Sequence, residues 1–195
     1  MLSIIEHLGK SHLISTTTQP IGLKPMPNWI HNEVTFTHSD PHKLEEMADI
    51  FRESDRPFDQ LIPEPDWPNV PAASNIKDSA GNPVAKKGEL PEKIVLKLAS
   101  GRESIEYEWP SSGRRDARWY DWRRKHWGCK QNPSDVEVNF QMAANLVHMN
   151  FNTPWNPPHG IYEKLCEMGY EFINWQYQDE CEEEIHYLVP LEVVA

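Results

Sequence analysis

The residues whose types and spacing could support covalent or metal chemistry are three cysteines and their polar neighbours. Asp121, His126 and Cys129 lie close together, and such a group could supply an orienting carboxylate, a base and a nucleophile. Cys129 could instead join Cys166 and Cys181 as zinc ligands. Zinc modules usually carry closely spaced ligand pairs, which this sequence lacks, and short-range proximity is weak support for a catalytic group. We therefore predict no catalytic residue, no metal and no cofactor.

Two further patterns bear on enzymatic chemistry. Glu33 and Glu137 could lie near one another, as a general acid and base would, but nothing singles them out. His148 and His186 fit positions on a sheet surface. The 9 glycines are scattered singly, which excludes nucleotide hydrolysis of the P-loop type. A small enzyme of unknown reaction remains one alternative.

The densest feature is the segment from residue 114 to residue 130, here called the Arg/Trp segment. Trp119, Trp122, His126 and Trp127 recur at a spacing that places them on one stripe of a helix. This stripe could stack on bases while arginines contact phosphates, although aromatic stripes at helical spacing are more often buried. We expect the arginines to point away from the stripe. The predicted partner-binding residues here are Arg114, Arg115, Trp119, Arg123 and Arg124.

The chain is acidic, with a formal net charge of −11 that is unevenly distributed. Residues 113–130 contain seven basic and two acidic residues, so this stretch carries +5 and the rest of the chain −16. Such a balance disfavours general affinity for nucleic acid. The run from Asp179 to Glu184 fits either a solvated turn or a surface offered to a basic partner that handles nucleic acid. The predicted partner-binding residues in this run are Glu180, Glu182, Glu183 and Glu184.

The cysteine pattern and the hydropathy bear on the compartment. Three cysteines at wide spacing do not form a disulfide framework, so we expect the reducing cytoplasm. Glu6 and His7 interrupt the apolar start of the chain, and no apolar run is long enough to span a bilayer. We therefore expect no membrane contact. The sequence does not define the oligomeric state.

Apolar periodicity predicts an α+β protein. A strand is expected at 30–37, and Asp40-Pro41 should start a helix that ends at Arg56-Pro57. Seven prolines between 57 and 91 predict a loop over 58–70. The other expected elements are hairpins at 94–109 and 136–151, a helix at 119–127 ended by Gly128, a helix capped at Asn156 with Ile161, Leu165 and Met168 as its buried stripe, and strands at 173–177 and 185–191.

This order of elements matches a ferredoxin-like split βαβ plan, in which two helices lie on one face of an antiparallel sheet. We expect residues 1–25 to form an arm or extension. Residues 26–195 would then form a single ferredoxin-like domain with a long insertion at about 55–132.

Four motifs carry a resemblance to a known family. They are Met26-Pro27-Asn28-Trp29, Leu61-Ile62-Pro63-Glu64-Pro65, Trp119-Tyr120-Asp121-Trp122-Arg123 with Trp127-Gly128 and Lys130, and Thr153-Pro154-Trp155-Asn156-Pro157-Pro158. The chain from Met26 onward resembles the YubB-like family of phage and conjugative-plasmid proteins. The resemblance implies a ferredoxin-like domain and a mobile-element setting, without catalytic residues. That family usually begins at the Met-Pro-Asn-Trp motif, so residues 1–25 are either an extension or a misassigned start.

Charge, the lack of a catalytic constellation and this resemblance together predict a non-enzymatic accessory protein of a phage or plasmid. It would bind and inhibit a host protein complex in the host cytoplasm. The expected target is a nucleic-acid-directed defence system, so the protein would be anti-CRISPR-like. The alternative is a nucleic-acid-binding module that uses the Arg/Trp segment.

Overall fold

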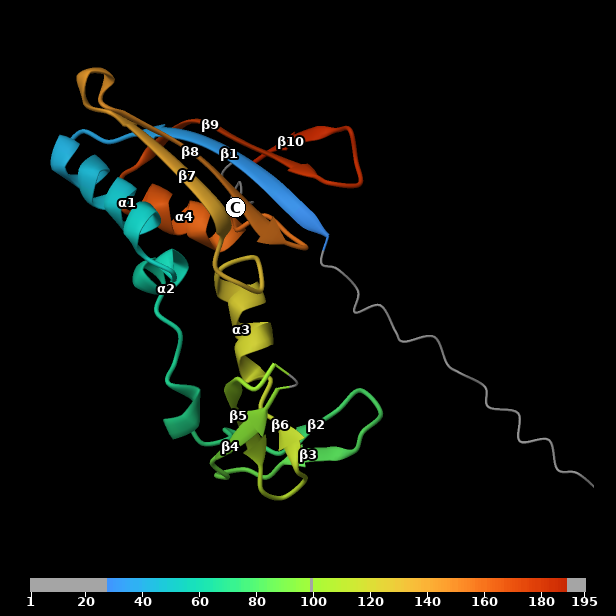
Figure 1. Cartoon of the computed structure of the whole chain (residues 1–195). Helices are drawn as coiled ribbons and strands as arrows, with labels where there is room; N and C mark the ends of the chain where they lie inside the picture. The colour runs from blue at the N-terminus through green and yellow to red at the C-terminus, as the bar shows by residue number, and fades with distance from the viewer. Residues whose placement is uncertain (1–27, 99, 189–195) are drawn as a thin grey trace, which may run out of the picture.

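A five-stranded antiparallel sheet forms the upper part of the molecule in Figure 1. The computed structural model describes residues 28–98 and 100–188, so the predicted arm at 1–25 and the end of the last predicted strand lie outside the described residues. The sheet has the spatial order β10-β9-β1-β8-β7. Its strands are β1 (Trp29–Thr37), β7 (Ser134–Gln141), β8 (Leu146–Pro154), β9 (Glu171–Asp179) and β10 (Ile185–Tyr187). The predicted first strand and the hairpin at 136–151 are confirmed.

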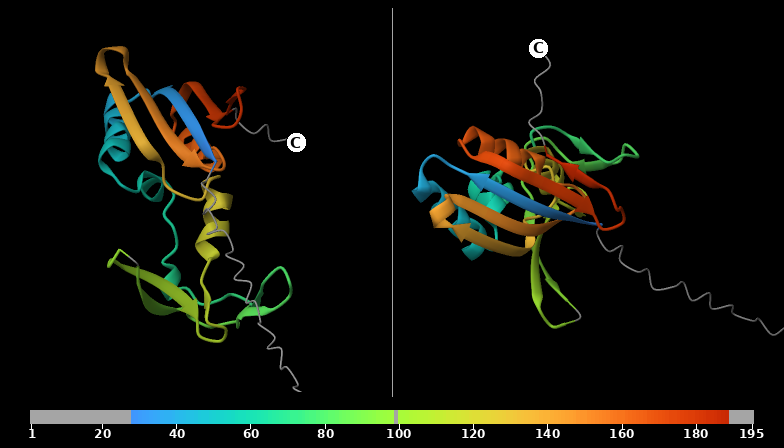
Figure 2. Two further views of the ribbon diagram at one scale, coloured as in Figure 1. Left: turned by 45° about the vertical axis from the view of Figure 1, so that its right-hand side comes forward. Right: turned by 90° about the horizontal axis from the view of Figure 1, so that it is seen from above.

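Two helices, α1 (Pro41–Glu53) and α4 (His159–Glu167), lie on the same face of this sheet (Figures 1 and 2). Helix α1 begins as predicted, because the Asp40 carboxylate accepts a hydrogen bond from the His42 amide at 3.0 Å. Pro41 follows at a position where no amide is needed. The described structure is therefore an α+β protein.

The start and the buried face of α4 differ from the prediction. The helix begins after Pro158, and Asn156 does not cap it. The Asn156 carbonyl oxygen instead accepts a hydrogen bond from the Thr153 hydroxyl at 2.9 Å, which closes a turn ahead of the helix. Met168, predicted to be buried, lies beyond the last helical residue and is 38% exposed, whereas Tyr162 packs into the core.

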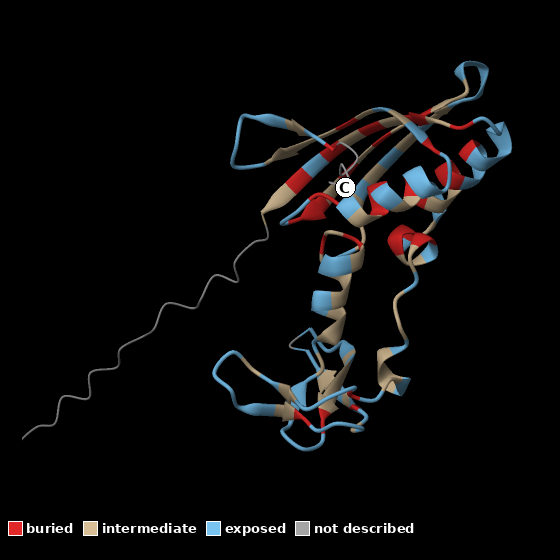
Figure 3. Ribbon diagram, turned by 180° about the vertical axis from the view of Figure 1, so that it is seen from behind, coloured by how far each residue is buried: buried red, intermediate tan, exposed pale blue. Residues whose placement is uncertain are grey.

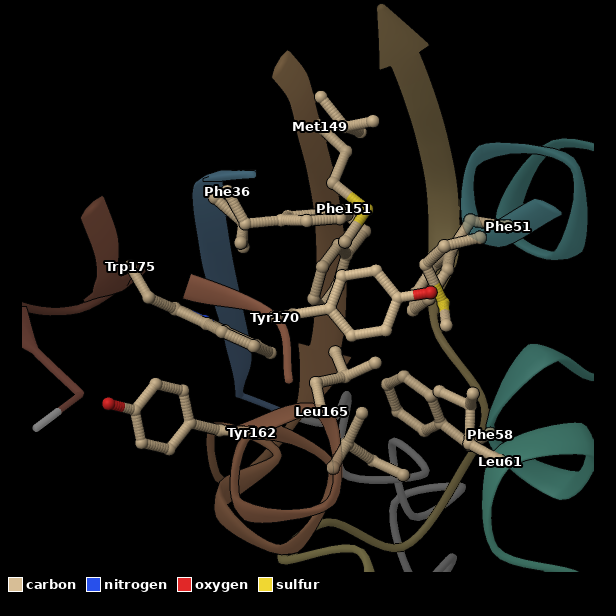
Figure 4. Close-up of a cluster of buried hydrophobic side chains, with 14 of the residues drawn as sticks. Phe36, Phe51, Phe58, Leu61, Met149, Phe151, Tyr162, Leu165, Tyr170 and Trp175 are labelled. Atoms are coloured by element: carbon tan, nitrogen blue, oxygen red, sulfur yellow. The ribbon is translucent and has the colours of Figure 1, made fainter. Parts of the chain in front are cut away.

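Aromatic side chains fill the core between the sheet and the helices (Figure 4). The Phe151 ring on β8 lies 6.1 Å from Trp175 on β9 and 6.2 Å from Phe58, measured between ring centres. Phe36 on β1 and Leu165 on α4 are fully buried in the same cluster. Every second residue of each central strand faces this core, which explains the alternation in the sequence.

One apolar residue at the start of β9 lies on the opposite side of the sheet from the core. The strand at 173–177 is confirmed, but Ile173 is 62% exposed. The register of β9 against β1 shifts between Thr35 and Phe36, so that Phe36 pairs with Phe172. The irregularity adds one residue to β9 and turns Ile173 away from the helices. Phe172 packs against Phe36 in its place, with ring centres 5.7 Å apart.

The predicted loop at 58–70 is partly wrong, because its first residues form the short helix α2 (Pro57–Leu61). Pro57 stands at the first helical position, where its fixed φ favours the helix. Phe58 and Leu61 lie in the main core, so α2 anchors the chain as it leaves the sheet. A 3₁₀ turn, η1 (Trp67–Asn69), follows.

Residues 57–130, here called the insertion, lie between α1 and β7 in the sequence and extend below the sheet in Figure 1. The elements after η1 are β2 (Ile76–Lys77), β3 (Pro83–Ala85), β4 (Glu92–Lys97), β5 (Glu103–Trp109), β6 (Arg114–Arg115) and α3 (Arg118–His126). The β4–β5 hairpin and the helix are confirmed, whereas β2, β3 and β6 are too short to leave a periodic signal.

The insertion buries few side chains of its own (Figure 3). Its separate cluster of fully buried residues consists of Ala72, Ala85 and Trp109. So small an apolar core contributes little stability. The insertion therefore depends on polar contacts and on its connection to the sheet.

That connection is a close approach between the end of α3 and the start of α4. The Gly160 amide donates to the Trp127 carbonyl oxygen at 3.1 Å. Gly128 ends α3, as predicted, with a φ of +91°. A Cβ at Gly128 would lie 2.5 Å from the His159 amide nitrogen, and a Cβ at Gly160 would overlap the His126 carbonyl oxygen.

Replacing Gly160 by alanine should lower the free energy of unfolding by about 2 kcal/mol, because the backbones of α3 and α4 leave no room for a Cβ. Denaturant titration followed by circular dichroism measures this change. Glu163→Ala, at an exposed position of the same helix, is the control and should change stability by less than about 0.5 kcal/mol. Equal stabilities of the two variants would contradict the packing.

Candidate functional site

The Arg/Trp segment contains β6 and α3, and its tryptophans Trp122 and Trp127 pack into the protein. Trp127 is fully buried, and its indole Nε1 donates to the Ile62 carbonyl oxygen at 3.0 Å. Trp122 packs against the main core and stacks on His126, with ring centres 4.5 Å apart. The prediction that packing dominates this stripe is confirmed for Trp122 and Trp127.

Arg123 does not point away from the stripe, and that prediction is wrong. Its guanidinium binds the Glu64 carboxylate through Nε at 3.0 Å and Nη2 at 2.5 Å. Its Cζ lies 4.9 Å from the ring centres of both Trp119 and Trp127. The Glu64 side chain is only 8% exposed, and it also accepts a hydrogen bond from Trp67 Nε1 at 2.8 Å. Arg123 thus joins α3 to the chain that leaves α2.

A second arginine is enclosed in the same way. Arg118 makes a two-point ion pair with Asp116, from Nε to Oδ1 at 2.9 Å and from Nη2 to Oδ2 at 2.7 Å. Its Nη1 donates to the Val70 carbonyl oxygen at 2.8 Å, and its Nη2 donates to that of Trp67 at 3.0 Å. The guanidinium also packs on the Trp109 ring at 4.6 Å. The sequence did not indicate that Arg118 is enclosed, because a hydrogen bond to a backbone carbonyl can form with any residue type and so gives no sequence pattern.

Arg114 and Arg115 are exposed but paired with carboxylates. Arg114 binds Asp78 at 2.7 Å, and this hydrogen bond is the main reason why the pKa of Asp78 falls to about 2. Arg115 binds Glu106 on the neighbouring strand at 2.5 Å. Of the arginines predicted to contact a partner, only Arg124 lacks a carboxylate within 4 Å in the part of the chain that the structure describes.

The structure gives no support to a catalytic group of Asp121, His126 and Cys129. Cys129 is fully buried and donates to the Gln131 carbonyl oxygen at 3.2 Å, and burial raises its pKa to about 12. His126 stacks on a tryptophan, and Asp121 is exposed. A thiol that ionises so poorly is not a nucleophile near neutral pH.

The other chemical candidates are not assembled into sites either. Across residues 28–98 and 100–188, no three His, Cys, Asp or Glu side chains are placed to hold a metal ion. Asn150 of β8 pairs with both Glu33 and Glu137, so a whole strand separates the two carboxylates. Glu33 accepts a hydrogen bond from Gln176 at 2.6 Å. The remaining cysteines, Cys166 and Cys181, are exposed.

The acidic turn, residues 179–184, connects β9 to β10 and is anchored where it begins. Asn28 Nδ2 donates to both Asp179 carboxylate oxygens, at 2.8 and 2.7 Å. The Trp29 amide donates to Glu180 Oε1 at 3.1 Å. Glu182, Glu183 and Glu184 are exposed, as a partner-binding role requires. Among the described residues, the one salt bridge of these glutamates joins Glu182 to His186 at 3.5 Å.

A second acidic surface, which the sequence analysis missed, lies on the outer side of α1. A shallow groove of about 720 Å³ runs along this helix, and Glu45, Glu46, Asp49 and Glu53 are the acidic residues that line it. They could have been found as the polar complement of the predicted apolar stripe of the helix. Arg52 pairs with Asp49 and neutralises part of this charge.

Charge divides between the two parts of the structure. Residues 28–56 and 131–188, here called the sheet unit, contain 17 carboxylates and 4 Lys or Arg, a formal charge of −13. The insertion contains 11 carboxylates and 13 Lys or Arg, a formal charge of +2. Ion pairs within the insertion already engage Arg114, Arg118 and Arg123. The molecule thus combines a strongly acidic sheet unit with a nearly neutral insertion.

Comparison with known proteins identifies no relative. No family model matches the chain, and no curated protein or solved structure matches it. In the described part of the chain, no helix combines the length and apolar character needed to cross a bilayer.

Replacing Arg123 by alanine should lower the free energy of unfolding by about 2 kcal/mol, because Glu64 would keep its buried charge without its main partner. Arg124→Ala removes the same kind of side chain from an exposed position and should cost less than about 0.5 kcal/mol. Thermal or denaturant unfolding of both variants measures the difference. Similar losses for both would show that the Arg123 contacts are not needed for stability.

The thiols should differ sharply in reactivity. In the native protein at pH 8, Cys166 and Cys181 should react with an aromatic disulfide reagent, whereas Cys129 should react only after unfolding, because it is buried and has a pKa near 12. Absorbance of the released thiolate counts the reactive groups. A Cys129→Ser variant identifies the slow thiol. Three fast thiols in the native protein would refute the assignment.

Proposed function

We propose that this protein is a non-enzymatic accessory factor that binds a positively charged surface on another protein complex and blocks it. The observation that carries the proposal is the concentration of negative charge on the sheet unit, which contains 17 carboxylates and only 4 Lys or Arg. A surface of one sign accelerates encounter with a surface of the opposite sign and favours partners that themselves bind nucleic acid.

The acidic turn is suited to be the contact point. Its first residues are held by Asn28 and Trp29, so the turn does not have to be ordered when a partner binds. Its following glutamates are exposed and have no Lys or Arg partner among the described residues. The groove along α1 adds a second acidic surface on the same unit.

The alternative function, nucleic-acid binding through the Arg/Trp segment, has less support. Arg118 and Arg123 are enclosed in ion pairs, and Arg114 and Arg115 bind neighbouring carboxylates. Counterion release needs cations that are free to meet phosphates. The geometry of this segment therefore does not favour binding of a nucleic-acid strand along its whole length.

We further propose that the sheet unit has a ferredoxin-like topology and that the chain is a YubB-like protein. Two observations support the topology. The elements follow one another in the sequence as β1, α1, β7, β8, α4 and β9, and the strands lie in the sheet in the order β9-β1-β8-β7. The proposed family depends on the four sequence motifs alone. In the structure these motifs contact one another in pairs: the Asn28 carbonyl oxygen accepts from the Trp155 amide at 2.7 Å, and Arg123 binds Glu64. The mobile-element setting and the host cytoplasm follow from this resemblance.

The proposal is tested by charge reversal in the acidic turn. The variant Glu182→Lys/Glu183→Lys/Glu184→Lys should reduce recovery of a bound complex from host lysate at least tenfold. The control Glu92→Lys/Glu103→Lys/Asp121→Lys makes the same charge change on exposed residues of the insertion and should stay within twofold of the original protein. Quantitative mass spectrometry after affinity capture measures recovery. Equal recovery with both variants would contradict docking through the turn.

The defence target has its own test. In cells with an active nucleic-acid-directed defence system, expression of the protein should raise plating of a targeted phage at least tenfold, and the triple-lysine variant of the turn should not. A catalytically dead defence system serves as the control. If the protein captures a host complex but does not raise phage plating, it still binds a partner, but the defence complex is not its target.

A further inference from the structure

A small cleft where α3 faces the end of β8 is not used by the acidic docking proposal. Its volume is about 290 Å³, and its lining consists of Tyr120, Arg124, Lys130, Pro154, Trp155 and Asn156. We call it the Trp155 cleft. It differs from the acidic surfaces in two ways, because no carboxylate lines it and because two aromatic rings do.

The two cations of the cleft are available for a ligand. Lys130 Nζ lies 5.3 Å from the centre of the Trp155 ring, and Arg124 Cζ lies 5.6 Å from that of Tyr120. Within residues 28–98 and 100–188, neither cation lies within 4 Å of a carboxylate, unlike the other four arginines of α3 and β6. The positive charge of the Arg/Trp segment that is not neutralised internally is thus concentrated here and at Lys125.

Trp155 has a backbone conformation that only a strong local constraint maintains. Its φ is +72°, which is unfavourable for a large side chain, yet 45% of the residue is exposed. Its amide donates to the Asn28 carbonyl oxygen at 2.7 Å, which fixes the turn. Packing does not explain this strained and exposed tryptophan. Strain of this kind is concentrated at sites that bind ligands.

We propose that the Trp155 cleft binds a nucleoside phosphate, either free or as one nucleotide of a single strand. The base would stack on the ring of Trp155, and the phosphate would bind Arg124 and Lys130. The Asn156 amide can donate to and accept from the edge of a base. The volume suits one nucleotide. Because Asn28 also holds Asp179, negative charge lies close by and opposes binding of a long strand.

The test uses the full chain, labelled with ¹⁵N, and titrates it with UMP, AMP, inorganic phosphate and a four-nucleotide thymidine DNA. The Trp155 indole N–H should shift and saturate at millimolar or lower nucleotide concentration, with phosphate alone binding at least tenfold more weakly. Tighter binding of the DNA than of UMP would assign the site to a strand, and the reverse to a free nucleotide. No saturable shift with any nucleotide would overturn the proposal.

Two variants separate binding from folding. Arg124→Gln/Lys130→Gln should weaken nucleotide binding at least tenfold, whereas Arg102→Gln/Lys125→Gln, with the same charge change at exposed positions, should change it less than twofold. Trp155→Gly, followed through the backbone amide signals of Tyr120, Arg124 and Asn156, should abolish binding while keeping or raising the melting temperature, because glycine accepts a φ of +72°. Equal losses in both double variants, or binding retained by Trp155→Gly, would overturn the assignment.

Discussion

The enclosure of two arginine guanidiniums, Arg118 and Arg123, is the interaction on which the fold of the insertion depends. Each guanidinium lies between tryptophan rings and a carboxylate that is itself less than a tenth exposed. The insertion has little apolar core, so these charge-assisted and cation–π contacts take the place of hydrophobic burial. Removing one member of such a pair leaves an unpaired buried charge, which is why the geometry is so constrained.

This use of arginine also determines the electrostatic character of the molecule. The insertion has a formal charge of only +2, and four of its arginines pair with its own carboxylates, so it does not balance the negative charge of the sheet unit. An acidic sheet with an anchored acidic turn suits a basic partner. Among the described residues, two of the three cations of the Arg/Trp segment that lack a carboxylate partner, Arg124 and Lys130, line a single aromatic cleft. The two proposals thus use different residues and can succeed or fail separately.

Local sequence patterns were sufficient to predict the main elements. Alternation predicted β1 and the β7–β8 hairpin, and Asp40-Pro41 predicted the start of α1, because these signals depend on near neighbours. The bulge that exposes Ile173 could not be predicted in this way, since it depends on the register of β9 against the distant strand β1. The helix at Pro57 was missed because the many prolines of this stretch were interpreted as a loop, although a proline also suits the first position of a helix. The burial of Arg123 was missed for the same reason. Its partner Glu64 is 59 residues away in the sequence.

The most direct test of the account is a ¹⁵N-edited NMR measurement of arginine side chains at neutral pH. The Nε–H groups of Arg118 and Arg123 donate to carboxylates, so they should give resolved signals that exchange slowly with water, whereas those of Arg102 and Arg124 should exchange rapidly. Rapid exchange at Arg118 and Arg123 would contradict the account, since these cations would then be free on the surface and the insertion would not neutralise its own charge.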